Sequence, residues 1–310
     1  MLKYVVRRLL WLSVLLLFVS LVTFSLARFG PGDPAQLRLG LKPGSEESLE
    51  RIRHQLGTDR PFVVQYGSYM YGFFHGDLGE SFKFQGQRVA TVIHRRIGIS
   101  AQLSLAALLL SFGLGVPLGH FAATRQGTWV DSGIMSVVIF FASVPGYVSA
   151  PFLLWFLVLK VHLLPVAGWD GLFSTHIIMP VLSMGIPSVA SIARLTRASG
   201  LNVLRQDYVR TARAKGLSER VVQVRHVMKN SMIPILTIMG LSLGGLVEGS
   251  IIAETLYGIP GIGRLVTESI SARDYPVIMA LTLIVAFTFV IANLLADVLY
   301  SYLDPRIRYT

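Results

Sequence analysis

Side chains that could do chemistry are sparse in this sequence. It contains no cysteine, which excludes thiolate nucleophiles, disulfides and cysteine-ligated metals. It also lacks a Gly-x-x-x-x-Gly-Lys-Ser/Thr phosphate loop and a His-Glu-x-x-His pair. His54, His75 and His94 do not have the spacing of metal ligands. We therefore expect no catalytic, cofactor-binding or metal-binding residue, and any ATP must be hydrolysed by another chain.

Two residues near the end of one apolar run are candidates for lining a passage. Gly244 belongs to a Gly-x-x-x-Gly pair in residues 232–253, where small residues permit either close helix contact or a passage. At about 1.5 Å per residue, Glu248 falls in the outer third of this run and Glu254 near the outer surface. Glu248 could meet a cationic part of a cargo, such as a peptide amine, or could be a structural carboxylate. Both interpretations stay open.

A basic segment lies between two long apolar runs and must face water. Residues 194–229 contain nine Arg and Lys residues against only Asp207 and Glu219. The positive-inside rule places this segment in the cytoplasm. Gly216 stands where a left-handed C-cap would end a first helix, and Ser218 can cap a second helix after it.

Both helices of this segment carry apolar residues at helical spacing. The stripe expected on the first helix is Leu201, Leu204, Tyr208 and Ala212, and that on the second is Val221, Val224, Met228 and Met232. A loop that needed only to be soluble would have no reason to keep such stripes in phase. We therefore expect the segment to dock on a cytoplasmic protein, rather than to be held only by lipid headgroups.

The composition is that of a membrane protein. The 310 residues are 53% hydrophobic and only 15% charged, which is too apolar for an ordinary soluble domain. A span needs about 20 mostly apolar residues. We predict an all-α integral membrane protein with about six transmembrane helices, at residues 9–27, 97–121, 130–159, 177–193, 232–253 and 277–300. The net charge of +11 is concentrated beside the spans, where anionic lipid accounts for it, so nucleic acid is not an expected partner.

The N-terminal third is expected to hold one span and a folded outer region. Residues 1–28 are predicted to be an uncleaved first span with a cytoplasmic N-terminus, because the apolar run exceeds the roughly 7–15 residues of a signal-peptide core. Residues 29–96 are predicted to be extracytoplasmic and folded, because aromatic residues recur closely through residues 62–74. Helix starts are expected at Ser45 and after Asp59.

Residues 97–310 are expected to form a core of five transmembrane helices. The cytoplasmic loop, residues 197–231, lies between the fourth and fifth spans, and the C-terminus is cytoplasmic. Within the third span, Pro145, Gly146 and Pro151 predict a bend or close packing.

Residues 207–219, DYVRTARAKGLSE, resemble the cytoplasmic coupling loop of ABC importer permease subunits in the dipeptide, oligopeptide and nickel branch. Arg210 and Thr211 stand where the general coupling-loop pattern has Glu and its first Ala, whereas Ala212 and Gly216 match it. The resemblance extends over nearly the whole chain. Its supporting stretches are Gln65-Tyr66, GDLGES at 76–81, GIPGIGR at 258–264, RDYPV at 273–277 and LDPR at 303–306.

The resemblance implies a non-enzymatic transport subunit of a bacterial inner membrane. It implies pairing with a second homologous permease, two cytoplasmic ATP-binding subunits and an extracytoplasmic substrate-binding protein. Short peptides are the implied cargo, with nickel chelates or glutathione as alternatives. The residues implied in coupling to the ATPases are Tyr208, Arg210, Thr211, Ala212, Arg213, Ala214, Lys215, Gly216, Leu217, Ser218 and Glu219. Alternatives of other classes are an ion-coupled secondary transporter relying on Glu248, and a membrane receptor or scaffold.

Overall fold

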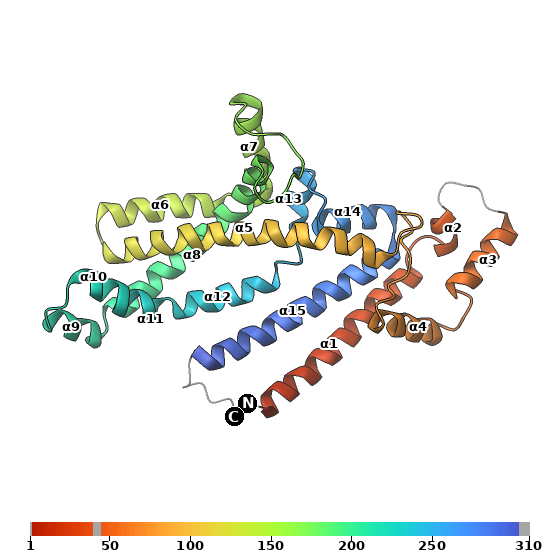
Figure 1. The fold of residues 1–310 in the computed structure, drawn as a ribbon, viewed down its shortest axis with the longest axis horizontal. Coiled ribbons are helices and arrows are strands. Elements are labelled where there is room, and N and C mark those ends of the chain that lie inside the picture. Colours follow the sequence, from red (N-terminus) through yellow and green to blue (C-terminus); the bar gives the residue numbers. More distant parts are fainter. Residues whose placement is uncertain (1, 40–44, 304–310) are drawn as a thin grey trace.

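The structure, a computed structural model, describes residues 2–39 and 45–303. The N-terminal part consists of one long helix, a region of three shorter helices, and a second long helix (Figure 1). These are α1 (Leu2–Phe29), α2 (Pro34–Leu39), α3 (Glu46–Leu56), α4 (Phe62–Phe74) and α5 (Val89–Thr124). As predicted, Ser45 is the N-cap of α3, accepting a hydrogen bond from the Ser48 amide, and α4 begins directly after Pro61.

The remainder of the described chain is also helical, with two π-helical turns. The elements are α6 (Trp129–Ser143), α7 (Gly146–Leu153), the π-helix η1 (Leu154–Lys160), the 3₁₀ turn η2 (Thr175–Ile177), α8 (Ile178–Leu204), α9 (Asp207–Ala214), α10 (Glu219–Val221), the π-helix η3 (Val222–Met228), α11 (Lys229–Ser231), α12 (Ile233–Gly244), α13 (Ile251–Leu256), α14 (Ile262–Ala272) and α15 (Tyr275–Leu303). Helices α9 and α10 lie at the opposite end of the molecule from α2–α4 (Figure 1).

The described helices account for four to six membrane spans. Four are long and apolar enough to cross alone, and two bent pairs could each make one further span. The four lie within α1, α5, η2–α8 and α15, which confirms four of the predicted segments as continuous helices. The third and fifth predicted spans are not single helices.

The third predicted span breaks at Val144 and changes direction by 95° between α6 and the α7–η1 helix. Val144 is extended because the ring of Pro145 disfavours the helical conformation in the residue before it. Pro145 then serves as the N-cap of α7. The bend expected at Pro145 and Gly146 is therefore present, but it divides residues 130–159 into two helices. The second of them projects sideways from the bundle (Figure 1).

The fifth predicted span is shorter than residues 232–253. Helix α12 begins at Ile233, after a 47° bend from the preceding helix, and ends at Gly244. A turn over residues 245–248 follows, and then the separate helix α13. Three glycines, Gly244, Gly245 and Gly249, surround this turn, and glycine lowers helical stability because it has the most backbone freedom to lose.

Among the described helices, α5 and α8 have the most extensive mutual contact. At Gly115 a Cβ atom would lie 2.8 Å from Ile192, and at Gly119 it would collide with the Ala193 carbonyl oxygen. The hydroxyl of Ser111 on α5 donates to the Gly185 carbonyl of α8 at 3.2 Å. Small residues thus bring the two backbones into direct contact, the arrangement that stabilises helix pairs where lipid removes the hydrophobic driving force.

Helix α6 is joined to α8 by an ion pair whose carboxylate is buried and whose guanidinium is partly exposed. Asp131 is 3% exposed, and its two carboxylate oxygens accept hydrogen bonds from Arg197 Nε at 2.6 Å and Nη2 at 2.7 Å. The amide of Gly127 donates to the same carboxylate at 3.1 Å. Arg197 lies on α8, and this helix continues to Leu204, beyond the predicted end of the fourth span at residue 193.

The outer region is tied to the last span through another buried carboxylate. Asp274, fully buried just before α15, accepts hydrogen bonds from the amides of Phe82 at 3.0 Å and Lys83 at 3.1 Å, and from the Ser81 hydroxyl. The segment between α4 and α5 is therefore fixed to the N-terminal end of α15. Of the predicted C-terminal stretch at 303–306, residues 304–306 lie outside the described residues.

Replacing Gly119 with alanine should destabilise the protein, because the new methyl group must push α5 away from the α8 backbone. We expect a loss of about 1–3 kcal/mol in the free energy of unfolding, typical of overpacking. The matched control is Gly113→Ala on the same helix, where a Cβ atom meets nothing within 4 Å. Thermal unfolding in detergent should separate the two variants; equal midpoints would contradict the close α5–α8 contact.

Candidate functional site

The predicted basic segment is a compact helical hairpin, but its first helix is not continuous with the preceding span. Helix α8 ends at Leu204, residues 205–206 form a turn, and α9 starts at Asp207. The expected stripe through Leu201, Leu204, Tyr208 and Ala212 is therefore wrong as one helical face. Val209 is fully buried and Ala212 nearly so, whereas Tyr208 is 43% exposed.

Gly216 forms the predicted elbow between the two arms of the hairpin. Its φ angle of +77° lies in the left-handed region, which glycine adopts without the steric cost of a Cβ atom. The Gly216 amide donates to the Arg213 carbonyl at 2.9 Å, and the Leu217 amide donates to the Ala212 carbonyl at 3.4 Å. Ser218 occupies the predicted N-cap position of α10, although its side chain makes no capping hydrogen bond.

The second arm packs differently from the predicted stripe because it contains a π-helix. In η3 the hydrogen-bonded repeat is i to i+5, which brings residues five apart onto one side. Val222 and Val227 are both fully buried and pack with Val209 and Ala212. Val221 and Val224, which α-helical periodicity placed in the predicted docking stripe, are exposed.

Apolar side chains on the hairpin remain uncovered by the rest of the described chain. Tyr208, Leu217, Val221 and Val224 are 43%, 41%, 38% and 58% exposed. Among the eleven candidate coupling residues, Ala212 is buried in the hairpin core and the other ten are exposed. The hairpin thus has an inner core that holds its shape and an outer surface of mixed apolar and basic character, which suits a protein partner.

An exposed ion pair joins the two helices on either side of the elbow, α9 and α10. Arg213 donates from Nε to Glu219 at 3.1 Å and from Nη2 at 2.9 Å, and Gln223 donates to the same carboxylate at 2.6 Å. The hydrogen bond from Arg213 holds the pKa of Glu219 below its ordinary value. The resulting stabilisation is present above the ordinary pKa of glutamate and is lost as the pH falls through the lowered pKa. Because both side chains are about half exposed, it contributes at most about 1 kcal/mol.

The two candidate passage residues lie in different local settings. Gly244 is buried, and a Cβ atom there would collide with Ala292 of α15, so the glycine permits close contact between α12 and α15. Glu248 is exposed in the turn over residues 245–248, beyond the end of α12. The position of Glu248 cannot be counted along the helix axis from Met232, because α12 ends at Gly244.

Glu254 is the buried carboxylate that sequence reasoning placed near the outer surface. It is fully buried on α13 and accepts hydrogen bonds from Ser100 Oγ of α5 at 2.7 Å and from the Arg264 amide of α14 at 3.1 Å. Ser100 in turn accepts from the Ile262 amide at 2.7 Å. Gly261 leaves the space that the carboxylate occupies. The glycines at 249, 258, 261 and 263 were the available sequence signal, because closely spaced glycines indicate tight backbone packing.

Comparison with known proteins finds similarity over the full chain. Residues 115–309 match the family described as binding-protein-dependent transport system inner membrane component, and residues 1–104 match the N-terminal model of such membrane components. The dipeptide transport system permease protein DppB of Alkalihalophilus pseudofirmus is 37% identical, with both chains covered completely. The oligopeptide transport system permease protein OppB of Escherichia coli strain K12 is 36% identical, again with complete coverage of both chains.

A solved structure shares the fold. An inward-facing structure of the MetNI methionine ABC transporter matches with a TM-score of 0.56 at 16% sequence identity. The match covers 69% of this chain and 96% of the other. At this identity the likeness concerns the helical architecture alone.

Replacing Glu254 with glutamine should loosen the α13–α14 region. One carboxylate oxygen becomes an amide nitrogen, which cannot accept from the donors around it, and an unmet buried donor costs about 1–3 kcal/mol. We expect faster amide hydrogen exchange across residues 250–264. Glu248→Gln makes the same chemical change at an exposed position six residues earlier and should leave exchange unchanged. Unaltered exchange in the Glu254 variant would show that the buried hydrogen bonds do not hold this region.

Proposed function

The chain belongs to the family of binding-protein-dependent transport system inner membrane components, and on this premise we propose that it is the permease subunit of an ABC importer of short peptides. It would form half of the translocation pathway, paired with a second homologous permease. ATP would be hydrolysed on two cytoplasmic partner subunits, and an extracytoplasmic binding protein would deliver the cargo. The sequence has no phosphate loop with which to bind ATP itself.

The full-length similarity to dipeptide and oligopeptide permeases supports peptides as the cargo class. Nickel chelates and glutathione are the alternative cargoes within the same branch.

The geometry that supports ATP-driven coupling is the elbow at Gly216. It turns the chain so that Tyr208 on one arm and Val224 on the other remain exposed for a partner. The hairpin connects directly to α8 at one end and to α12 at the other. Ser199 of α8 donates to the Ser231 carbonyl of α11 at 2.9 Å, which ties the two bases of the hairpin together. A force applied by a docked ATPase would thus act on two membrane helices at once.

An ion-coupled carrier is less well supported. Such a carrier needs an intramembrane carboxylate or histidine that can bind and release its driving ion. Glu248 is exposed in a turn, and Glu254 is occupied by hydrogen bonds from Ser100 and backbone amides. The proposed orientation places both termini and the Gly216 elbow in the cytoplasm.

Replacing Gly216 with valine should release the ATPase subunits while leaving the chain in the membrane. A β-branched residue at a φ of +77° is strained by about 1–3 kcal/mol, so the elbow must open. Gly127→Val is a closely matched control, because Gly127 has the same φ of +77° and equally open surroundings, but lies in the turn between α5 and α6. Co-purification should fall for the Gly216 variant and persist for the control. Equal retention would contradict docking at the elbow.

Peptide import should require the whole assembly. We expect vesicles containing the two permeases, the ATPases and the binding protein to accumulate a labelled dipeptide only when ATP is supplied on the ATPase side. Unlabelled di- and oligopeptides should compete, and glutathione or a nickel chelate should not. Uptake by this chain alone, driven by a proton or sodium gradient, would reject the proposal in favour of a secondary transporter.

A further inference from the structure

Helix α4 has no charged side chain and carries an apolar face that nothing in the described chain covers. Its sequence is FVVQYGSYMYGFF. Val63, Tyr71 and Phe74 are 76%, 68% and 75% exposed. Together with Gly67 they follow steps of four, four and three residues, so they lie along one face of the helix. Three large exposed side chains on one uncharged helix indicate a surface that has a partner in the assembled protein.

The neighbouring helix α3 has the opposite character. Its sequence, EESLERIRHQL, contains three glutamates, two arginines and a histidine, and none of its residues is buried. Such a helix is suited to water. The two adjacent helices of the outer region are therefore suited to different surroundings, which argues against a single aqueous environment for both.

Contacts with α1 fix the depth of α4. The hydroxyl of Tyr66 lies 2.6 Å from Ser20 Oγ and 3.5 Å from the Leu17 carbonyl oxygen. The apolar span of α1 ends at Phe29, so Ser20 lies nine residues, or about 13 Å, inward from its outer end. The hydrocarbon layer is about 30 Å thick. Tyr66 therefore reaches α1 at the level of the acyl chains.

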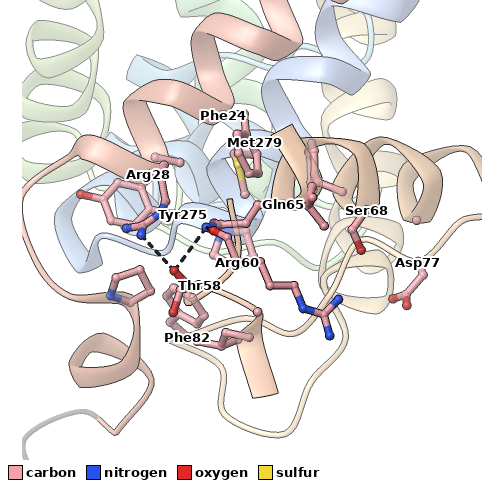
Figure 2. Close-up of a pocket in the computed structure, with 18 residues that line it drawn as sticks. Phe24, Arg28, Thr58, Arg60, Gln65, Ser68, Asp77, Phe82, Tyr275 and Met279 are labelled. Atoms are coloured by element: carbon pink, nitrogen blue, oxygen red, sulfur yellow. Dashed lines mark hydrogen bonds between the residues drawn. The ribbon is translucent and has the colours of Figure 1, made fainter. Parts of the chain in front are cut away.

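The start of α4 is held at the outer end of the same span. The Thr58 carbonyl accepts hydrogen bonds from Arg28 Nη2 at 3.0 Å and from Gln65 Nε2 at 3.2 Å (Figure 2). The ring of Phe24 packs edge-on against Phe62, with centroids 5.5 Å apart. A cationic side chain at the end of a span is typical of the headgroup level. In Figure 1, α4 lies close to the C-terminal half of α1 and extends away from it.

We propose that α4 is an interfacial membrane helix, with its face of Val63, Gly67, Tyr71 and Phe74 covered by acyl chains of the outer leaflet. Lipid is favoured over a protein partner because α4 contacts a span, α1, whose own side chains near this end are apolar and exposed. Leu26 of α1, for example, is 68% exposed. The helix has no charge to keep it in water, and its aromatic residues are of the kind that gather at membrane interfaces. The helix would anchor the outer region to the membrane beside α1.

Spin labelling can test this proposal directly, because the chain has no cysteine of its own. Val63→Cys and Phe74→Cys would each carry a nitroxide in the fully assembled importer, reconstituted in phosphatidylcholine vesicles. Glu50→Cys, at an exposed position of α3, is the matched control. The measurement compares collision of each label with oxygen, which concentrates in lipid, and with a water-soluble nickel complex.

We expect the oxygen-to-nickel collision ratio to be several-fold higher at residues 63 and 74 than at residue 50. Ratios at or below that of residue 50 would place α4 in water and overturn the proposal. Immobilised labels shielded from both probes would also overturn it, because they would show that another protein subunit covers the face. The test does not depend on the cargo, so a failure of peptide import would leave its result unaffected.

Discussion

A carboxylate that is buried away from water needs hydrogen-bond donors positioned around it. The arrangement of the described helices depends on meeting this requirement at three places. Asp131, Glu254 and Asp274 are each almost fully buried, and each joins segments far apart in the sequence. Asp131 joins α6 to α8 through Arg197, Glu254 joins α13 to α5 and α14, and Asp274 joins the 81–83 segment to the start of α15. Removing one partner would leave the other buried without compensation, which costs far more than an exposed ion pair is worth. These contacts therefore specify how helices of similar apolarity are arranged.

Local physical rules were enough to predict part of this arrangement. Length and hydropathy identified the four spans that are continuous helices, because an isolated helix in lipid needs only apolar side chains and satisfied backbone groups. The Gly216 elbow was predictable because a left-handed C-cap has a residue-specific cost. The position of the hairpin at the end opposite α2–α4 also agrees with the expected charge asymmetry (Figure 1).

The errors came from interactions that no single segment encodes. The inward-facing residues of the hairpin, Val222 and Val227, depend on a π-helical register that an α-helical reading cannot anticipate. Because α12 ends at Gly244, Glu248 lies in a turn and not in a helix. The burial of Glu254 depends on Ser100, which is 154 residues away in the sequence. The break at Val144 was foreseen as a bend, but its 95° size depends on how α7 packs against its neighbours.

The contact between α5 and α8 at Gly115 and Gly119 limits where this protein can flex. With the α5 glycines in direct contact with the α8 backbone, one helix has little room to slide or tilt against the other. Flexing is then expected at interruptions elsewhere, such as Val144 between α6 and α7 or Met232 between α11 and α12. Helices α5 and α8 would then move together as one rigid unit, and conformational change would occur at the breaks around them.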